Sequence, residues 1–205
     1  MCGQFDVLTD PNLLALFIEL GGKDRIIPGD RILVAPTLTA PVIVEDSETG
    51  TLGLLPARFG LVPHWYRGCL KDWKASTFNA RIEEADSKRT FHGPWRYRHC
   101  VVPAEAFYEG AGPKADRQKW RITRGDNQPL AFAGLWDEAR TFEGDVFSFT
   151  VLTRPAGPDM QAIHEREPVV LGPDDWDRWL RRRPVDLKRY TPLKLQNLTP
   201  QASLF

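Results

Sequence analysis

The stretch that decides the fold is LAFAGLWDEARTFEGDVFSFTVL, residues 130–152. It holds two apolar runs, Leu130–Leu135 and Val146–Leu152, which are joined by a short polar segment containing Gly144. Short apolar runs rich in aromatic and β-branched residues and bounded by turn residues are typical of β-strands. Their close spacing favours antiparallel pairing through a hairpin.

The same pattern recurs on both sides of this stretch. Further strands are predicted at Ile32–Ala35, Val42–Val44, Leu52–Leu55, Cys100–Val102 and Trp120–Ile122. Their close spacing favours antiparallel pairing through hairpins and meanders over repeated strand-helix-strand units. The sequence therefore predicts an α+β fold, a strongly bent, barrel-like and mostly antiparallel β-sheet with peripheral helices.

Helical signals are few. Residues 12–20 carry leucines and a phenylalanine at helical spacing, with Asp10 as the N-cap. A second helix is predicted from Gly172 to about Arg182, because Pro173 and two aspartates form a favourable first turn. Pro158–His164 is a candidate for a short helix.

Length and composition predict one folded domain. The chain has 205 residues, of which 42% are hydrophobic and 26% charged. We expect a single catalytic domain at residues 2–183 and an extended C-terminal tail at 184–205. No apolar run approaches the length of a membrane span, and the start does not resemble a signal peptide. A monomer in the cytoplasm, associated with the nucleoid when bound to DNA, is the resulting expectation.

The formal net charge is zero, but basic residues are clustered. Between Arg58 and Arg98, nine basic residues face four acidic ones, a local charge of +5. Between Arg178 and Lys194, seven basic residues face one aspartate. Such clusters are either ordinary solvated surface or a groove that follows phosphates.

The chain has three cysteines, Cys2, Cys69 and Cys100, at spacings that indicate neither a disulfide framework nor a zinc site. Removal of Met1 would make Cys2 a 1,2-aminothiol, with reference pKa values of about 7.7–8.0 for the amine and about 8.5 for the thiol. An aldehyde reacts with such a group first as a Schiff base and then as a thiazolidine ring. Position alone favours an idle cysteine, so the case for a reactive Cys2 depends on other parts of the chain.

Five segments carry a family resemblance. They are MCG at residues 1–3, FGLVPHW at 59–65, NARIEE at 79–84, CVVPAEAFYE at 100–109 and FTVLTRPAGPDMQAIHEREPVVL at 149–171. In this order they resemble the SOS response-associated peptidase (SRAP) family, whose members form protein–DNA crosslinks at abasic sites. The resemblance implies an abasic site processing protein that acts on single-stranded DNA and uses no cofactor or metal.

Carried over by position, the resemblance makes Cys2 the nucleophile, with Asn79, Glu109 and His164 around it. Asn79 would hold the Cys2 amine or the sugar, or instead cap a helix that begins near Ala80. Glu109 follows an apolar strand and would move protons during Schiff-base formation. His164 would protonate the sugar ring oxygen and favour the open-chain aldehyde.

Three further residues are predicted to contact DNA. Arg81 suits a phosphate, Trp65 could stack on a base or pack in the core, and Gln4 occupies a position where many relatives have arginine. Two other positions also depart from the family pattern: Gly110 stands where tryptophan is common, and Glu167 replaces an apolar residue. The changes at Gln4 and Gly110 predict altered DNA affinity rather than altered chemistry.

Two other functions are compatible with these residues. An N-terminal cysteine is also the nucleophile of amidohydrolases and of self-processing peptidases, which require an oxyanion hole. A non-catalytic single-strand binder would need the basic and aromatic surface but not Cys2. The expected enzyme activity is crosslinking or lyase chemistry at abasic sites, with autoproteolysis as the alternative.

Overall fold

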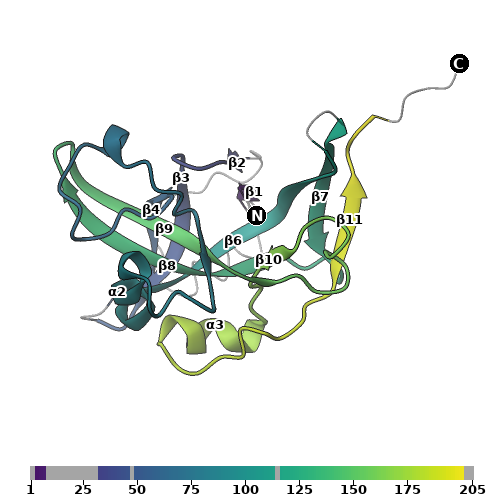
Figure 1. The fold of residues 1–205 in the computed structure, drawn as a ribbon. Coiled ribbons are helices and arrows are strands. Elements are labelled where there is room, and N and C mark those ends of the chain that lie inside the picture. The colour runs from purple at the N-terminus through teal and green to yellow at the C-terminus, as the bar shows by residue number, and fades with distance from the viewer. Residues whose placement is uncertain (1–2, 8–31, 47–48, 114–115, 201–205) are drawn as a thin grey trace, which may run out of the picture.

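A computed structural model describes residues 3–7, 32–46, 49–113 and 116–200 (Figure 1). The strands are β1 (Gln4–Val7), β2 (Ile32–Val34), β3 (Thr39–Glu45), β4 (Leu52–Phe59), β5 (Asn79–Arg81), β6 (His99–Ala111), β7 (Gln118–Arg124), β8 (Leu130–Thr141), β9 (Gly144–Pro155), β10 (Arg166–Pro168) and β11 (Leu193–Asn197). The helices are α2 (Arg89–Tyr97), α3 (Pro173–Leu180) and the 3-10 turn η1 (Leu70–Asp72).

The strands form one mixed sheet that curls into a partial ring. The pairings β8–β9, β9–β4, β4–β3, β3–β6 and β6–β8 form a closed circuit. Two of these links are short, since β4 and β9 pair only at Arg58–Ser148 and Phe59–Phe149, and β3 and β6 pair at two positions. The ring is therefore not a clean barrel. The strands β1, β2, β7 and β11 extend the sheet from β6.

The predicted bent, barrel-like sheet with peripheral helices is confirmed, with refinements. Each predicted strand is present, and β6 and β8 are much longer than their apolar runs. The hairpin of the opening stretch pairs Leu135 with Thr150 and Thr141 with Gly144. Two contacts of β9, those with β4 and β5, are parallel. Those pairings join segments distant in sequence, which periodicity within one segment does not reveal.

Alternate residues of the central strands enter two different cores. Leu130 and Phe132 of β8 belong to one core, whereas Ala131, Ala133 and Leu135 belong to the other. The first core contains edge-on contacts of Phe5 with Phe59, Phe132 and Phe149. Burying each such ring contributes about 1.5–3 kcal/mol. Burial on both faces explains why β8 is an uninterrupted apolar run instead of an alternating one.

Helices α2 and α3 both pack against β6 and cover the second core (Figure 1). His99, at the start of β6, joins them. Its Nδ1 lies 2.8 Å from the carbonyl oxygen of Trp179 in α3, and its Nε2 lies 2.8 Å from that of Trp95 in α2. The ring also stacks on Trp179 with 3.7 Å between centroids. Helix α3 is found where the sequence predicted it; α2 was not predicted.

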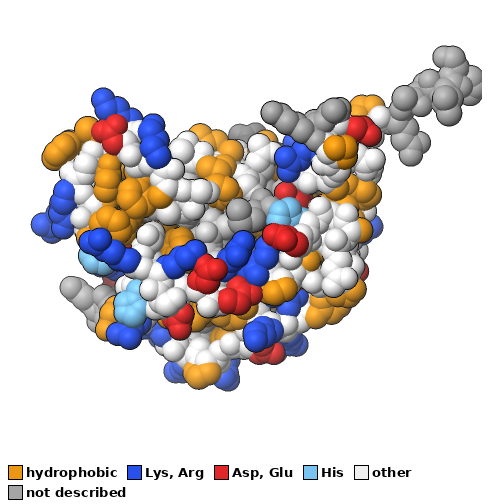
Figure 2. All heavy atoms as spheres, viewed as in Figure 1, with side chains coloured by type: hydrophobic (Ala, Val, Ile, Leu, Met, Phe, Trp, Pro, Cys, Tyr) orange, Lys and Arg blue, Asp and Glu red, His pale blue; other side chains and the backbone are white. Residues whose placement is uncertain are grey.

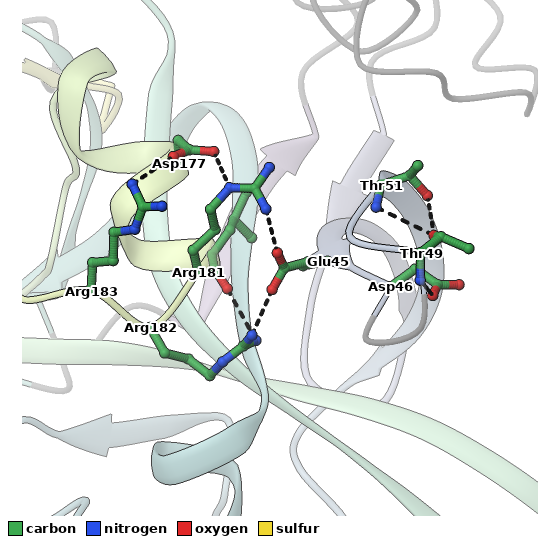
Figure 3. Close-up of polar contacts among 9 residues, drawn as sticks. Glu45, Asp46, Thr49, Thr51, Asp177, Arg181, Arg182 and Arg183 are labelled. Atoms are coloured by element: carbon green, nitrogen blue, oxygen red, sulfur yellow. Dashed lines mark hydrogen bonds and ion pairs between the residues drawn. The ribbon is translucent and has the colours of Figure 1, made fainter.

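The second basic cluster is largely neutralised where α3 ends. Arg181 and Arg182 each place a guanidinium nitrogen 2.6 Å from a different carboxylate oxygen of Glu45, whose side chain is 8% exposed (Figure 3). Arg181 also contacts Asp177 at 2.6 Å, and Arg183 approaches the same carboxylate at 3.8 Å. These cations attach α3 to β3. They do not form an open basic groove. On the face of the molecule shown in Figure 2, Lys and Arg side chains are interspersed with Asp and Glu.

Two local predictions change. Pro158–His164 forms successive turns instead of a helix, and a strand, β5, stands where a helix near Ala80 was the alternative. Residues 10–20, the predicted N-terminal helix, lie outside the described residues. The predicted extended tail contains β11, which pairs antiparallel with β7. Among the described residues, no helix is long and apolar enough to cross a membrane.

Candidate functional site

A cavity of about 370 Å³ opens beside the N-terminal strand. Its lining comes from β1, β6 and the segment that leads into β7: Gly3, Gln4, Tyr108, Glu109, Gly110, Arg117, Gln118 and Lys119. Gln4 stands opposite Tyr108 in the antiparallel pairing of β1 with β6. Cys2 itself lies outside the described residues, but its peptide bond joins it directly to Gly3, which lines the cavity. Two predicted site residues, Gln4 and Glu109, are thus brought together.

Glu109 is nearly buried in this cavity, with 7% of the residue exposed. Its Oε1 lies 3.3 Å from the backbone nitrogen of Gly110, which donates to it, and 3.9 Å from Nη2 of Arg117. Glu109 sits near the end of β6, as the sequence predicted. A carboxylate held beside a backbone donor and a cation has the components needed to accept and return a proton.

Arg117 occupies the space above Gly110. A Cβ atom built on Gly110 would overlap Nε of Arg117 and would lie 2.9 Å from its Cζ. The guanidinium also donates to the Gly110 carbonyl oxygen at 3.5 Å, while its side chain remains 58% exposed. Sequence reasoning noted Gly110 as a departure but missed Arg117, because the two residues meet only across the β6–β7 hairpin.

Asn79 and Arg81 lie on β5, which pairs in parallel with β9 at Val151 and Thr153. Asn79 is partly buried and Arg81 is exposed. Arg81 lies 3.7 Å from Glu84, an exposed pair that leaves the guanidinium accessible. Strand pairing, not a helix start, therefore positions Asn79.

His164 immediately precedes the bend that leads into β10, and its Nδ1 accepts the backbone N–H of Arg166 at 2.9 Å. A neutral imidazole whose Nδ1 accepts carries its proton on Nε2, so Nε2 is available as a donor. β10 pairs with Thr153–Pro155, so the segments bearing Asn79 and His164 both attach to the C-terminal half of β9. Neither residue is part of the lining of the 370 Å³ cavity.

Trp65 is half-buried in a cluster of aromatic residues. The Arg89 guanidinium lies 4.3 Å from the ring centroid, and Trp73 meets the ring edge-on at 5.8 Å. The preceding residues are anchored by the fully buried Asp137, which accepts the backbone N–H of His64 at 2.8 Å. Trp65 therefore packs against neighbouring side chains, and its stacking on a DNA base stays a prediction. Its Nε1 is buried without a hydrogen-bond partner among the described residues.

The other two cysteines are poor nucleophiles. Burial raises the pKa of the Cys100 thiol well above its usual range, and the residue is 0% exposed. Desolvation, then the negative charges of Glu143 and Asp72, raise the pKa of Cys69. Both thiols therefore stay protonated near neutral pH. In the described part of the chain, no cluster of His, Cys, Asp and Glu could hold a metal ion.

Glu167, the third departure from the family pattern, has a structural role. Its Oε1 lies 2.6 Å from Nη2 and 3.0 Å from Nε of Arg154, and its Oε2 accepts the backbone N–H of Gly157 at 2.9 Å. The two side chains are 2% and 8% exposed. The carboxylate is therefore one half of a buried ion pair between neighbouring strands.

Known proteins resemble this chain over nearly its whole length. The model of the family described as SOS response associated peptidase (SRAP) matches residues 1–203. The abasic site processing protein YoqW of Bacillus subtilis is 31% identical over 193 residues, which cover 91% of this chain and 83% of YoqW. The corresponding Escherichia coli protein, YedK, is 29% identical, with 89% and 80% covered.

Solved structures show the same fold. A crystal structure of a Bordetella bronchiseptica protein superposes with a TM-score of 0.82 at 25% identity, covering 97% of this chain and 100% of that one. A Bacteroides thetaiotaomicron protein gives a TM-score of 0.79 at 17% identity. With a family match across residues 1–203, the chain belongs to the SOS response associated peptidase family.

Proposed function

We propose that this protein processes abasic sites and that Cys2, after removal of Met1, captures the lesion covalently in single-stranded DNA. The observation that carries the proposal is the cavity in which Gly3, the residue bonded to Cys2, lies with Gln4 and Glu109. The names of the curated relatives, abasic site processing proteins, support the lesion as substrate. The raised thiol pKa values of Cys69 and Cys100 leave Cys2 as the candidate nucleophile.

The chemistry balances without an oxidant or a cofactor. The Cys2 amine adds to C1′ of the ring-opened sugar, and the resulting carbinolamine loses water to give an imine. The Cys2 thiolate then adds to the imine carbon, and the nitrogen takes up a proton to complete the thiazolidine. One water leaves overall. The ring ties protein to DNA and shields the lesion.

The surrounding residues supply proton transfer and orientation. Glu109, 3.3 Å from the Gly110 amide and 3.9 Å from Arg117, would take the proton from the attacking amine and return one to the departing hydroxyl. His164, with Nδ1 occupied by the Arg166 amide, would offer its Nε2 proton to the sugar ring oxygen. Asn79 would hold the amine or a sugar hydroxyl.

The test is incubation of the processed protein with single-stranded DNA that carries one abasic site. We expect a species of higher mass that survives denaturation, absent in Cys2→Ala and retained in the matched control Cys69→Ala. Intact mass must first show that Met1 has been lost. If Cys2→Ala crosslinks as well as the parent, the aminothiol mechanism is wrong.

Proton transfer is tested separately. Glu109→Gln should lower the crosslinking rate by about 10²-fold or more, as expected when a positioned acid–base group is lost. Glu138→Gln, which removes a carboxylate from β8, should leave the rate unchanged. Equal rates for Glu109→Gln and the parent would remove Glu109 from the mechanism.

The alternative, an N-terminal-cysteine amidohydrolase or autopeptidase, makes a different prediction. Such an enzyme would hydrolyse a glutamine side chain or a peptide in the absence of DNA. Under our proposal neither substrate is cleaved, and the crosslinked species forms only with abasic DNA.

A further inference from the structure

Two further hollows, which share lining residues with the cavity or with each other, lie along the outward face of β7. The 370 Å³ cavity shares Tyr108 and Lys119 with a hollow of about 560 Å³, which also contains Arg121 and Gln196. That hollow shares Arg121 and Gln196 with a third of about 600 Å³, which contains Thr123 and Lys194. The three hollows therefore follow β7 and β11 away from Gly3.

Strand register explains why cations gather on this face. Arg121 stands opposite Tyr108 of β6 and Gln196 of β11, and Lys194 stands opposite Thr123. Side chains that are directly opposite share a face, so Lys119, Arg121 and Thr123 point outward. The intervening Ile122 enters the first core, against which Trp120 also packs. We call Arg117, Lys119, Arg121 and Lys194 the β7 track.

The cations of the β7 track remain accessible. Lys119 and Lys194 are exposed, the Arg117 side chain is 58% exposed, and Arg121 is partly exposed. Lys119 Nζ lies 4.7 Å from the Tyr108 ring centroid, which fixes its direction. Arg121 and Lys194 form no ion pair with any other described residue. This contrasts with Arg98, Arg154 and Arg181, which are engaged by carboxylates.

The acidic residues that line the three hollows are fewer than the cations and are mostly buried. Asp6 is 1% exposed and accepts the Tyr108 hydroxyl at 2.7 Å, and Glu109 is 7% exposed beside Arg117. Glu105, in the third hollow, is partly exposed. The accessible charge along the β7 track is therefore mainly positive.

We propose that the β7 track binds successive phosphates of the single strand as it leaves the cavity. Alternate residues of a strand lie about 6.4–6.8 Å apart, a spacing that adjacent phosphates of an extended single strand can match. Cations that neutralise phosphates hold a strand without reading its sequence. This inference rests on the proposed function for its substrate and adds where the strand runs.

The test uses undamaged oligothymidylate, so that binding is measured apart from any crosslink. Affinity is determined over a series of salt concentrations for the parent, for Arg117→Gln, Lys119→Gln, Arg121→Gln and Lys194→Gln, and for the fourfold variant. Arg140→Gln is the matched control, because it removes an exposed cation from β8, on a different hairpin. Thermal unfolding of each variant verifies folding.

For single strands, the plot of log affinity against log salt has a slope of about −0.7 per neutralised phosphate. Each single variant should make the slope shallower by about 0.7, and the fourfold variant by about four times as much. Arg121→Lys should keep the parent slope, since charge rather than shape is required. The proposal that the β7 track binds DNA would be contradicted if the fourfold variant kept the slope of the parent. It would also be contradicted if Arg140→Gln made the slope as shallow as a single variant of the track does.

The two proposals can fail separately. If the parent does not crosslink abasic DNA but the slopes fall as expected, the covalent chemistry is wrong and the strand path stands. If the parent crosslinks and the slopes do not change, the chemistry stands and the strand runs elsewhere.

Discussion

Arg166 and Glu83 form a two-pronged ion pair, in which Nη1 and Nη2 of the guanidinium each lie 2.8 Å from one carboxylate oxygen. The same Nη2 donates to the carbonyl oxygen of Thr153 at 2.7 Å. Glu83 lies just after β5, Arg166 begins β10, and Thr153 is in β9. One guanidinium thus joins three strands, and it holds the segment of Asn79 against that of His164.

Glu83→Gln should destabilise the fold. Arg166, with a side chain 10% exposed, would keep its charge but lose its anionic partner. We expect a loss of about 1.5 kcal/mol in the free energy of unfolding, the lower end for hydrogen bonds to charged groups, because Glu83 is 41% exposed. Urea unfolding measures it. Glu84→Gln, which removes only exposed pairs with Lys88 and Arg81, should cost less.

The same pair should make stability depend on pH. The hydrogen bond from Arg166 lowers the pKa of Glu83 in the folded protein. A carboxyl whose pKa is lower in the folded state binds fewer protons there, so its stabilisation is complete above the unfolded pKa of about 4.3 and is lost as pH falls through the folded pKa. The difference in unfolding free energy between parent and Glu83→Gln should therefore shrink below about pH 4. A constant difference would contradict this cause.

For the buried pair of Arg154 and Glu167, we expect that replacing one residue destabilises the fold and that replacing both restores most of the stability. Glu167→Leu leaves the Arg154 charge buried and unpaired, which costs about 3–5 kcal/mol. Replacing both residues, as Arg154→Met with Glu167→Leu, removes that charge and should recover most of the loss. Urea unfolding of the single and double variants compares them. A double variant as unstable as Glu167→Leu would show that the Gly157 contact, not the ion pair, is decisive.

Gly110→Trp should displace Arg117 without unfolding the protein. The atoms that a Cβ would meet belong to the flexible end of the Arg117 side chain, and Gly110 has no left-handed backbone angle. We expect the salt slope for undamaged DNA to become shallower by about 0.7, as in Arg117→Gln.

Combining Gly110→Trp with Arg117→Gln should add nothing further, because both changes remove the same cation from the cavity mouth. Additive losses in the double variant would mean that Arg117 keeps its phosphate contact beside the tryptophan.

The amino-acid sequence determined the seven predicted strands, helix α3 and the family. These follow from local patterns: apolar runs such as Val146–Leu152, the Gly172–Pro173 helix start, and motifs with residue types in fixed order. Such signals depend only on neighbours in the chain. The short strands β5 and β10 carry too few residues to form without pairing, so only their contact with β9 specifies them.

Tertiary structure alone decided what the charged residues do. Between Arg178 and Lys194 the sequence shows a dense basic cluster, but the fold places Glu45 against Arg181 and Arg182 and neutralises them. Arg121 shares a face with Tyr108 and Gln196 because it is opposite both of them across neighbouring strands. Which charged groups interact depends on the distance between them in the folded protein, and groups that are close in space can be far apart in the sequence.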